Sequence, residues 1–239
     1  QAFLRLIIQC IRDGRLRQVA APTVADVTDN DGPMRVCGVD GCPDGWVVAT
    51  QTTLHVVGSL DDLVGQYDLV GIDMPIGMSM DGRRQCDTEA RKRLKKRACT
   101  VFPVPPRPLV HLLDYATANA ESKQRFGRGI PRQSFAIWPK IRELDEIARS
   151  YPGRFVEIHP ECSFTEMSGT VPPTKHGEPG KKFREKVLRE HFGSVPTDVD
   201  GAKRDDVLDA HAVLWSALRF SNGRFWRDSS RAVGPLRRW

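Results

Sequence analysis

Two short apolar segments of this chain each end in an aspartate, and this feature constrains the fold more than any other. Residues 35–40 (RVCGVD) end at Asp40, and residues 68–73 (DLVGID) end at Asp73. Both have the length and apolar character of buried β-strands. The second follows a short helical segment that begins after Ser59, and a strand reached through a helical crossover is typically parallel to its neighbour. We therefore expect two parallel strands whose carboxyl ends place Asp40 beside Asp73.

The remaining elements predict an α/β fold with a mixed sheet. Residues 46–50 and 54–57 have strand character, and with the first strand they predict an antiparallel meander. Residues 154–159 predict a late strand. Five further helices are expected, over about 87–97, 107–122, 133–149, 181–192 and 203–220. Because such an order of elements forms layers of helices on a sheet, we expect an RNase H-like mixed five-stranded sheet flanked by helices on both faces.

The chain has 239 residues, which suits one sizeable domain. Its first 33 residues end in the turn-rich stretch DNDGP and are followed by Met34. Either Met34 is the natural start, or residues 1–33 are an N-terminal extension packed on the domain, and both interpretations stay open. We expect the domain itself over residues 34–222. A basic C-terminal tail over 223–239 then holds five arginines against one acid.

The overall charge favours acidic partners. Lysine and arginine number 36 and aspartate and glutamate 30, which gives a net charge of +6 and makes nucleic acid an expected partner. The six cysteines form no Cys-x-x-Cys pair, so we expect reduced thiols in a cytoplasmic protein. No apolar run approaches the roughly 18 residues of a membrane span, and no membrane partner is expected.

A further group of acids begins the last predicted helix. Asp206 and Asp209 are three residues apart and share a helix face, where two like charges are mildly destabilising unless a cation joins them. Each acid also has a purely structural interpretation, since aspartates often begin turns and cap helices. Taken together, Asp40, Asp73, Asp206 and Asp209 predict a carboxylate site for Mg²⁺ or Mn²⁺, which suit phosphodiester hydrolysis.

The late strand runs into the segment VEIHPE, which contains Glu157, His159 and Glu161. If the extended conformation continues past Pro160, alternation places these three side chains on one face. His159 could then be a metal ligand, a general base or a hydrogen-bonded structural residue. The spacing matches no usual Cys/His arrangement for zinc.

The densest positive charge lies at Arg83, Arg84 and the run RKRLKKR over 91–97. It is either a solvated helix surface or a surface that follows a phosphate backbone, and the second would make binding strongly salt-dependent. The chain lacks a Gly-rich phosphate loop and a Gly-x-Ser-x-Gly motif, which argues against P-loop and serine hydrolase chemistry.

Several motifs together resemble a known family, domain of unknown function 429, which is described as predicted RNase H-like nucleases. The motifs are GVDGCPDGWVVA (38–49), LVGIDMPIGM (69–78), RQCDTEAR (84–91), VFPVPPR (101–107), Gln133 with IWPKI (137–141), VEIHPECSF (156–164) and DDVLDAHAVLWSA (205–217). The resemblance runs from about Val36 to Gly223. The chain departs from the family pattern at Asp44, where a small residue is usual, and near Lys175, where the family is more basic.

The resemblance implies roles for particular residues. The catalytic positions would be Asp40, Asp73, Glu157, Asp206 and Asp209, and all of these except Glu157 would be metal ligands. The characteristic positions assigned to substrate binding are Arg84, Arg91, Gln133, His159 and Glu161. Metal-dependent hydrolysis of DNA or RNA is the leading hypothesis.

Two alternatives remain beside it. One is a non-catalytic module of the same fold that binds nucleic acid or protein. The other, less favoured, is an actin-like ATP-dependent phosphotransferase. The loop after Asp40 carries Cys42 and Pro43 instead of the small hydroxyl residues that would contact a nucleotide phosphate.

Overall fold

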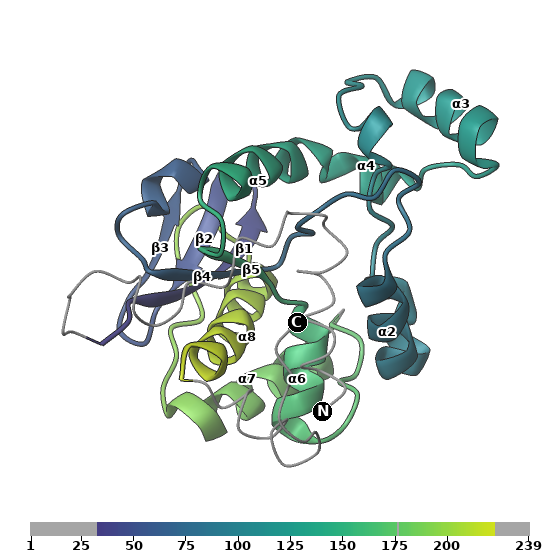
Figure 1. Cartoon of the computed structure of the whole chain (residues 1–239). Helices are drawn as coiled ribbons and strands as arrows, with labels where there is room; N and C mark the ends of the chain where they lie inside the picture. The colour runs from purple at the N-terminus through teal and green to yellow at the C-terminus, as the bar shows by residue number, and fades with distance from the viewer. Residues whose placement is uncertain (1–32, 176, 223–239) are drawn as a thin grey trace, which may run out of the picture.

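The computed structural model describes residues 33–175 and 177–222 and shows one five-stranded mixed sheet in them (Figure 1). The strand order is β3-β2-β1-β4-β5. The strands are β1 (Val36–Cys42), β2 (Gly45–Ala49), β3 (Leu54–Val57), β4 (Leu69–Ile72) and β5 (Phe155–Glu157). The first three form the predicted antiparallel meander, and β4 and β5 add parallel strands beside β1. This arrangement confirms the predicted α/β fold and is consistent with an RNase H-like fold.

Helices cover both faces of the sheet. The α-helices are α2 (Gln85–Leu94), α3 (Tyr115–Phe126), α4 (Arg132–Ala136), α5 (Trp138–Ser150), α6 (Pro160–Ser168), α7 (Glu178–Phe192) and α8 (Arg204–Ser221). Short 3-10 helices are η1 (Leu60–Leu63), η2 (Lys95–Thr100) and η3 (Arg107–Leu109). In Figure 1, α5 lies above the sheet, α8 lies below it, and α3 and α4 extend away at the upper right.

Alternation along β1 divides the apolar side chains between two cores. Val36 and Cys42 pack with α8 residues such as Val213 on one face. Cys37 and Val39 pack on the opposite face, in the core that includes residues of η1 and α5. Successive strand residues point to opposite faces, so a strand buried on both sides has the continuous apolar character that the sequence shows.

The long helix α8 packs directly on the two central strands because two glycines leave room for it. Gly38 of β1 is paired with Gly71 of β4. A Cβ atom at Gly38 would lie 2.2 Å from the backbone nitrogen of Leu214, and one at Gly71 would lie 2.8 Å from the Cβ of Ala217. The first turns of α8 are thereby fixed beside the carboxyl ends of β1 and β4.

Several predicted boundaries were wrong for identifiable reasons. The segment after His159 does not continue in an extended conformation but forms the helix α6, with Pro160 at its first position, where a missing N–H is tolerated. The helix expected over 107–122 begins only at Tyr115, capped by Asp114, and is preceded by the short η3. The helix expected over 133–149 is divided into α4 and α5.

The basic helix also differs from the expectation. It begins at Gln85 and ends at Leu94, because Lys95 has a positive φ of 50°. Cys86, Ala90 and Leu94 are buried along one side of it, so the helix has an apolar face that the charged run concealed.

Within the described ranges, no helix is both long enough and apolar enough to cross a membrane. The predicted tail over 223–239 and all but the last residue of the predicted extension over 1–33 lie outside the described residues.

Candidate functional site

Three aspartates from three different elements converge at one end of the sheet. Asp40 of β1, Asp73 directly after β4 and Asp209 of α8 each offer a carboxylate oxygen, and these oxygens lie within 4.8 Å of one another. We call these residues the three-carboxylate cluster. Asp40 and Asp209 are buried, whereas Asp73 keeps part of its surface exposed. Asp73 is therefore the least buried residue of the cluster.

The backbone fixes the direction of these side chains. The N–H of Asp73 donates to the carbonyl of Val39 at 2.9 Å, so the parallel pairing of β1 and β4 extends to the aspartate itself. The carboxylate of Asp40 accepts from the N–H of Gly41 at 2.7 Å. Both aspartates follow a glycine by two residues and thus lie on the α8 face of the sheet.

The crowding of negative charge changes how these groups bind protons. Burial, followed by the charges of Asp73 and Asp209, raises the pKa of Asp40 well above its usual range. Burial also raises the pKa of Asp73 to about 7, against the opposite influence of His159. Burial also raises the pKa of Asp209, although the positive charge of Lys175 opposes this rise. Like charges this close require a proton or a cation between them.

Asp206, the fourth predicted ligand, has a different position. Its carboxylate accepts from the backbone N–H of Lys203 at 3.1 Å and so caps the start of α8. Its charge contributes to the raised pKa of Asp40, but among the described residues it is not part of the group within 4.8 Å. The structure therefore brings together three of the four predicted ligands.

A lysine that was not assigned a role from the sequence lies against this cluster. Lys175, in the segment between α6 and α7, donates from Nζ to Asp209 at 2.9 Å. Its positive charge also opposes the rise in the pKa of Asp40 and of Asp73. No strand or helix periodicity marks this residue, so only the fold reveals its contact.

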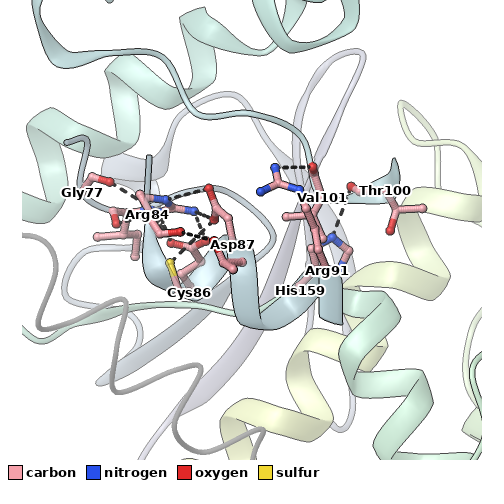
Figure 2. A network of polar contacts seen from close by, with 11 residues as sticks. Gly77, Arg84, Cys86, Asp87, Arg91, Thr100, Val101 and His159 are labelled. Carbon is pink, nitrogen blue, oxygen red and sulfur yellow. Dashed lines mark hydrogen bonds and ion pairs between the residues drawn. The ribbon is translucent and has the colours of Figure 1, made fainter. Parts of the chain in front are cut away.

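Arg84, labelled in Figure 2, forms an ion pair with Glu157, whose charge acts on Asp73 of the cluster. The Arg84 guanidinium donates to both carboxylate oxygens of Glu157, at 2.7 and 2.8 Å, and it also pairs with Asp87. Glu157 accepts in addition from the backbone N–H of Ile76 at 2.7 Å. The Arg84 side chain is only 3% exposed. This placement favours a supporting role for both residues, because their polar atoms already have protein partners.

The same network defines the loop after β4. Arg84 donates to the carbonyls of Ile76 at 3.1 Å and of Gly77 at 3.4 Å, and thereby closes the segment that follows Asp73. Because Glu157 ends β5, the ion pair ties this loop to the sheet. Cys86, Asp87 and Glu157 also form a second group of possible metal-ligand residues, but both of its acids already pair with the Arg84 guanidinium.

His159 and Arg91 lie on the other side of Figure 2, near Thr100 and Val101. The Nε2 of His159 lies 3.3 Å from the carbonyl of Thr100, and Arg91 donates to the carbonyl of Val101 at 2.9 Å. The Nδ1 atom of His159 is buried, and no partner for it exists among the described residues. The end of η2 is thus held beside the histidine whose charge acts on Asp73.

Glu161 does not share a face with Glu157 and His159, because the chain becomes helical at Pro160. It is buried and accepts from Arg184 at 2.8 and 2.9 Å and from Arg97 at 2.8 Å. The expected extended face past Pro160 was therefore wrong. The position of Glu161 indicates that it joins α6, α7 and η2.

The predicted phosphate-binding surface is divided between paired and exposed residues. Arg93 pairs with Glu166 and Arg97 with Glu161, so these two arginines tie the basic segment to α6. Lys95 and Lys96 are exposed. Gln133 is exposed on α4, a helix that extends away from the sheet in Figure 1.

The cluster fits a divalent cation by its donor chemistry. Mg²⁺ and Mn²⁺ prefer oxygen ligands, and three carboxylates supply them. Three negative charges and the one ammonium of Lys175 leave a formal charge of −3 + 1 = −2 on the ionised cluster. A divalent ion would balance that charge, with Asp40, Asp73 and Asp209 as the residues that would hold it.

The comparisons with known proteins agree with the resemblance seen in the motifs. A family model described as "Protein of unknown function (DUF429)" matches residues 38–230. No curated protein and no solved structure matches the chain. The family match includes the whole three-carboxylate cluster and spans most of the sequence, so the chain belongs to the DUF429 family.

Proposed function

We propose that this protein is a metal-dependent phosphodiesterase that hydrolyses DNA or RNA. The observation that supports this most is the convergence of Asp40, Asp73 and Asp209 within 4.8 Å. When bound at such a site, Mg²⁺ or Mn²⁺ activates water and stabilises the charge that develops on a phosphodiester. The chain contributes three carboxylates held by two strands and a helix, which keeps them preorganised.

The surroundings of the cluster support an anionic substrate. The exposed Lys95 and Lys96 belong to η2, whose last residue, Thr100, contacts His159. The basic segment is therefore linked through His159 to Asp73, on which the charge of His159 acts. Lysines in that position would attract the phosphates of a nucleic acid and give a salt-dependent affinity.

A cleavage assay tests the proposal. Short single- and double-stranded DNA and RNA are incubated with the full chain in Mg²⁺, in Mn²⁺ and in EDTA. Asp40→Asn should lower metal-dependent cleavage by about a hundredfold or more, since a ligand is lost while the shape is kept. The control is Asp44→Asn, which makes the same charge change at an exposed acid in the β1–β2 turn. Equal cleavage by Asp40→Asn and the wild type would refute the assignment.

The contact between Lys175 and Asp209 favours a second candidate, a non-catalytic nucleic-acid-binding module. In that case Lys175 would serve in place of a metal, and the carboxylates would be structural. Such a protein would bind nucleic acid equally well in EDTA and in Mg²⁺, and Mg²⁺ would not raise its melting temperature. Absence of cleavage together with metal-independent binding would support this candidate over the enzyme.

A further inference from the structure

The ammonium of Lys175 occupies a position where it acts on every member of the three-carboxylate cluster. It donates to Asp209 at 2.9 Å, and its charge lowers the proton affinity of both Asp40 and Asp73. The attraction of Asp209 in turn raises the pKa of Lys175, so the amine stays charged at physiological pH. The cluster thus already contains a cation supplied by the chain.

The segment that carries Lys175 is fixed by contacts with α7. Arg184 donates to the carbonyl of Pro173 at 3.2 Å. At Gly180, a Cβ atom would lie 1.9 Å from the carbonyl oxygen of Thr174, so only glycine allows this close approach. Lys175 therefore belongs to a packed segment that holds its side chain towards α8.

Arg184 is itself held in place by Glu161. Both oxygens of Glu161 accept from Nη2 of Arg184, and the two side chains are almost fully buried. The chain of contacts runs from Glu161 through Arg184 and Pro173 to the segment that carries Lys175. This gives Glu161 a physical role, because it positions the arginine on which the Lys175 segment rests.

A divalent ion and an ammonium cannot both use the same carboxylates without cost to each other. Their positive charges repel at such short separations, and Asp209 would have to divide its oxygens between them. Without the lysine, the ionised cluster would carry −3 instead of −2 and would bind a dication more tightly. Lys175 should therefore oppose metal binding.

We propose that Lys175 is an internal counter-ion that competes with the divalent metal for Asp209 and so sets the metal affinity of the site. This inference rests on the proposed function, because it assumes that the three-carboxylate cluster is a metal site. In the metal-free protein Lys175 stabilises the cluster. In the metal-bound protein its contact with Asp209 is weakened.

Calorimetric titration of the full chain with Mn²⁺ tests this. In Lys175→Met the Kd for Mn²⁺ should fall by about tenfold or more, since one opposing charge is removed at contact distance. Lys175→Arg keeps the charge and should bind Mn²⁺ about as weakly as the wild type. The matched control is Lys181→Met, which removes a lysine that lies 4.0 Å from Asp205 outside the cluster. Its Kd should stay within about threefold of the wild type.

A second measurement needs no variant. An amine-reactive ester labels exposed lysines, and mass spectrometry gives the labelling rate at each one. Saturating Mn²⁺ should raise the rate at Lys175 by about threefold or more, because the amine is released from Asp209, while the rate at Lys181 should not change. An unchanged rate at Lys175 would overturn the proposal even if Lys175→Met failed to fold.

The outcomes separate this inference from the proposed function. Metal-dependent cleavage with equal Mn²⁺ affinity in the wild type and Lys175→Met overturns the counter-ion role alone. Mn²⁺ binding by Lys175→Met but not by the wild type supports the counter-ion role and refutes a metal-dependent activity of the native chain. No Mn²⁺ binding by either protein overturns both.

Discussion

Gly38 of β1 and Gly71 of β4 are paired in the sheet, and each stands two residues before an aspartate of the three-carboxylate cluster. Side chains two residues apart on a strand share a face, so the glycines and the aspartates all lie on the side that α8 covers. The absence of two side chains lets the helix backbone approach, and the approach brings Asp209 to Asp40. The same close packing of α8 on the sheet therefore forms the core and brings the residues of the site together.

Replacement of Gly38 by alanine should be strongly destabilising. The new Cβ atom would lie 2.2 Å from the backbone nitrogen of Leu214 and 2.3 Å from the carbonyl oxygen of Ala210, neither of which can move independently of α8. We expect Gly38→Ala to lower the free energy of unfolding by about 3 kcal/mol, measured by urea denaturation. Gly58→Ala is the control, because nothing lies within 4 Å of its new Cβ atom, and its effect should stay within about 0.5 kcal/mol. Similar values for the two variants would contradict the packing described here.

The buried ion pair of Arg84 predicts a second stability effect. Arg84→Met leaves the carboxylates of Glu157 and Asp87 without their partner in a site almost closed to water. The expected loss is about 3–5 kcal/mol in the free energy of unfolding. Arg35→Met breaks an ion pair with Asp68 in which the two side chains are 52% and 39% exposed, and it should lower the stability far less than Arg84→Met does. A small effect of Arg84→Met would contradict a structural role for Arg84 and favour a contact with substrate instead.

The sequence predicted the strands and the convergence of two aspartates because both depend on local patterns. Apolar runs of strand length identify β1 and β4, and a crossover implies their parallel pairing, which places Asp40 beside Asp73. Asp209 could be recognised as a candidate because its spacing from Asp206 puts two acids on one helix face. Which of these two joins the cluster depends on the rotation of α8, and that is set by the close contact at Gly38.

Other parts of the site depend on contacts between distant segments, which no local pattern encodes. Arg84 and Glu157 are 73 residues apart, and Lys175 and Asp209 are 34 apart. As single residues they have the character of surface charges, and only the assembled fold buries or pairs them. The helix α6 was not predicted, although its Pro160 stands at the first position of a helix, where proline is favoured.

The raised pKa values of the cluster predict that the metal-free protein becomes less stable as the pH rises. The pKa of Asp73 is about 7 in the folded chain, against an ordinary value of 3.8, so the folded state binds more protons than the unfolded state between these values. Stability is therefore lost as the pH increases from about 4 to about 7, by up to about 1.4 kcal/mol per pH unit for each proton concerned. Urea denaturation in EDTA between about pH 4 and pH 7 measures this loss of the free energy of unfolding.

Asp73→Asn provides the control for this pH dependence. The amide does not titrate, so the decline in stability between about pH 4 and pH 7 should become shallower than in the wild type. Saturating Mn²⁺ should reverse the trend in the wild type, because the metal binds the deprotonated carboxylates and its release is favoured by protons. Identical profiles for Asp73→Asn and the wild type would show that Asp73 titrates normally in the folded chain.

The exposed lysines of η2 predict how nucleic-acid binding should depend on salt. Lys95 and Lys96 are exposed members of the basic run and belong to η2, whereas the exposed Lys92 pairs with Glu89. If each contacts one phosphate of a DNA duplex, Lys95→Gln with Lys96→Gln should reduce the slope of log K against log salt by about 2, since each contact contributes about 0.9. Fluorescence anisotropy at several salt concentrations measures the slope.

A double variant of α7 separates local contacts from net charge. Lys182→Gln with Lys186→Gln also removes two positive charges, here from exposed positions of α7. A general effect of net charge would lower the affinity equally in both double variants, whereas phosphate contacts at η2 would change the slope only in the first. Because Arg93 and Arg97 are paired with acids of α6, their loss should instead reduce stability. The basic run thus has two physical roles, and the salt slope measures only the one that concerns nucleic acid.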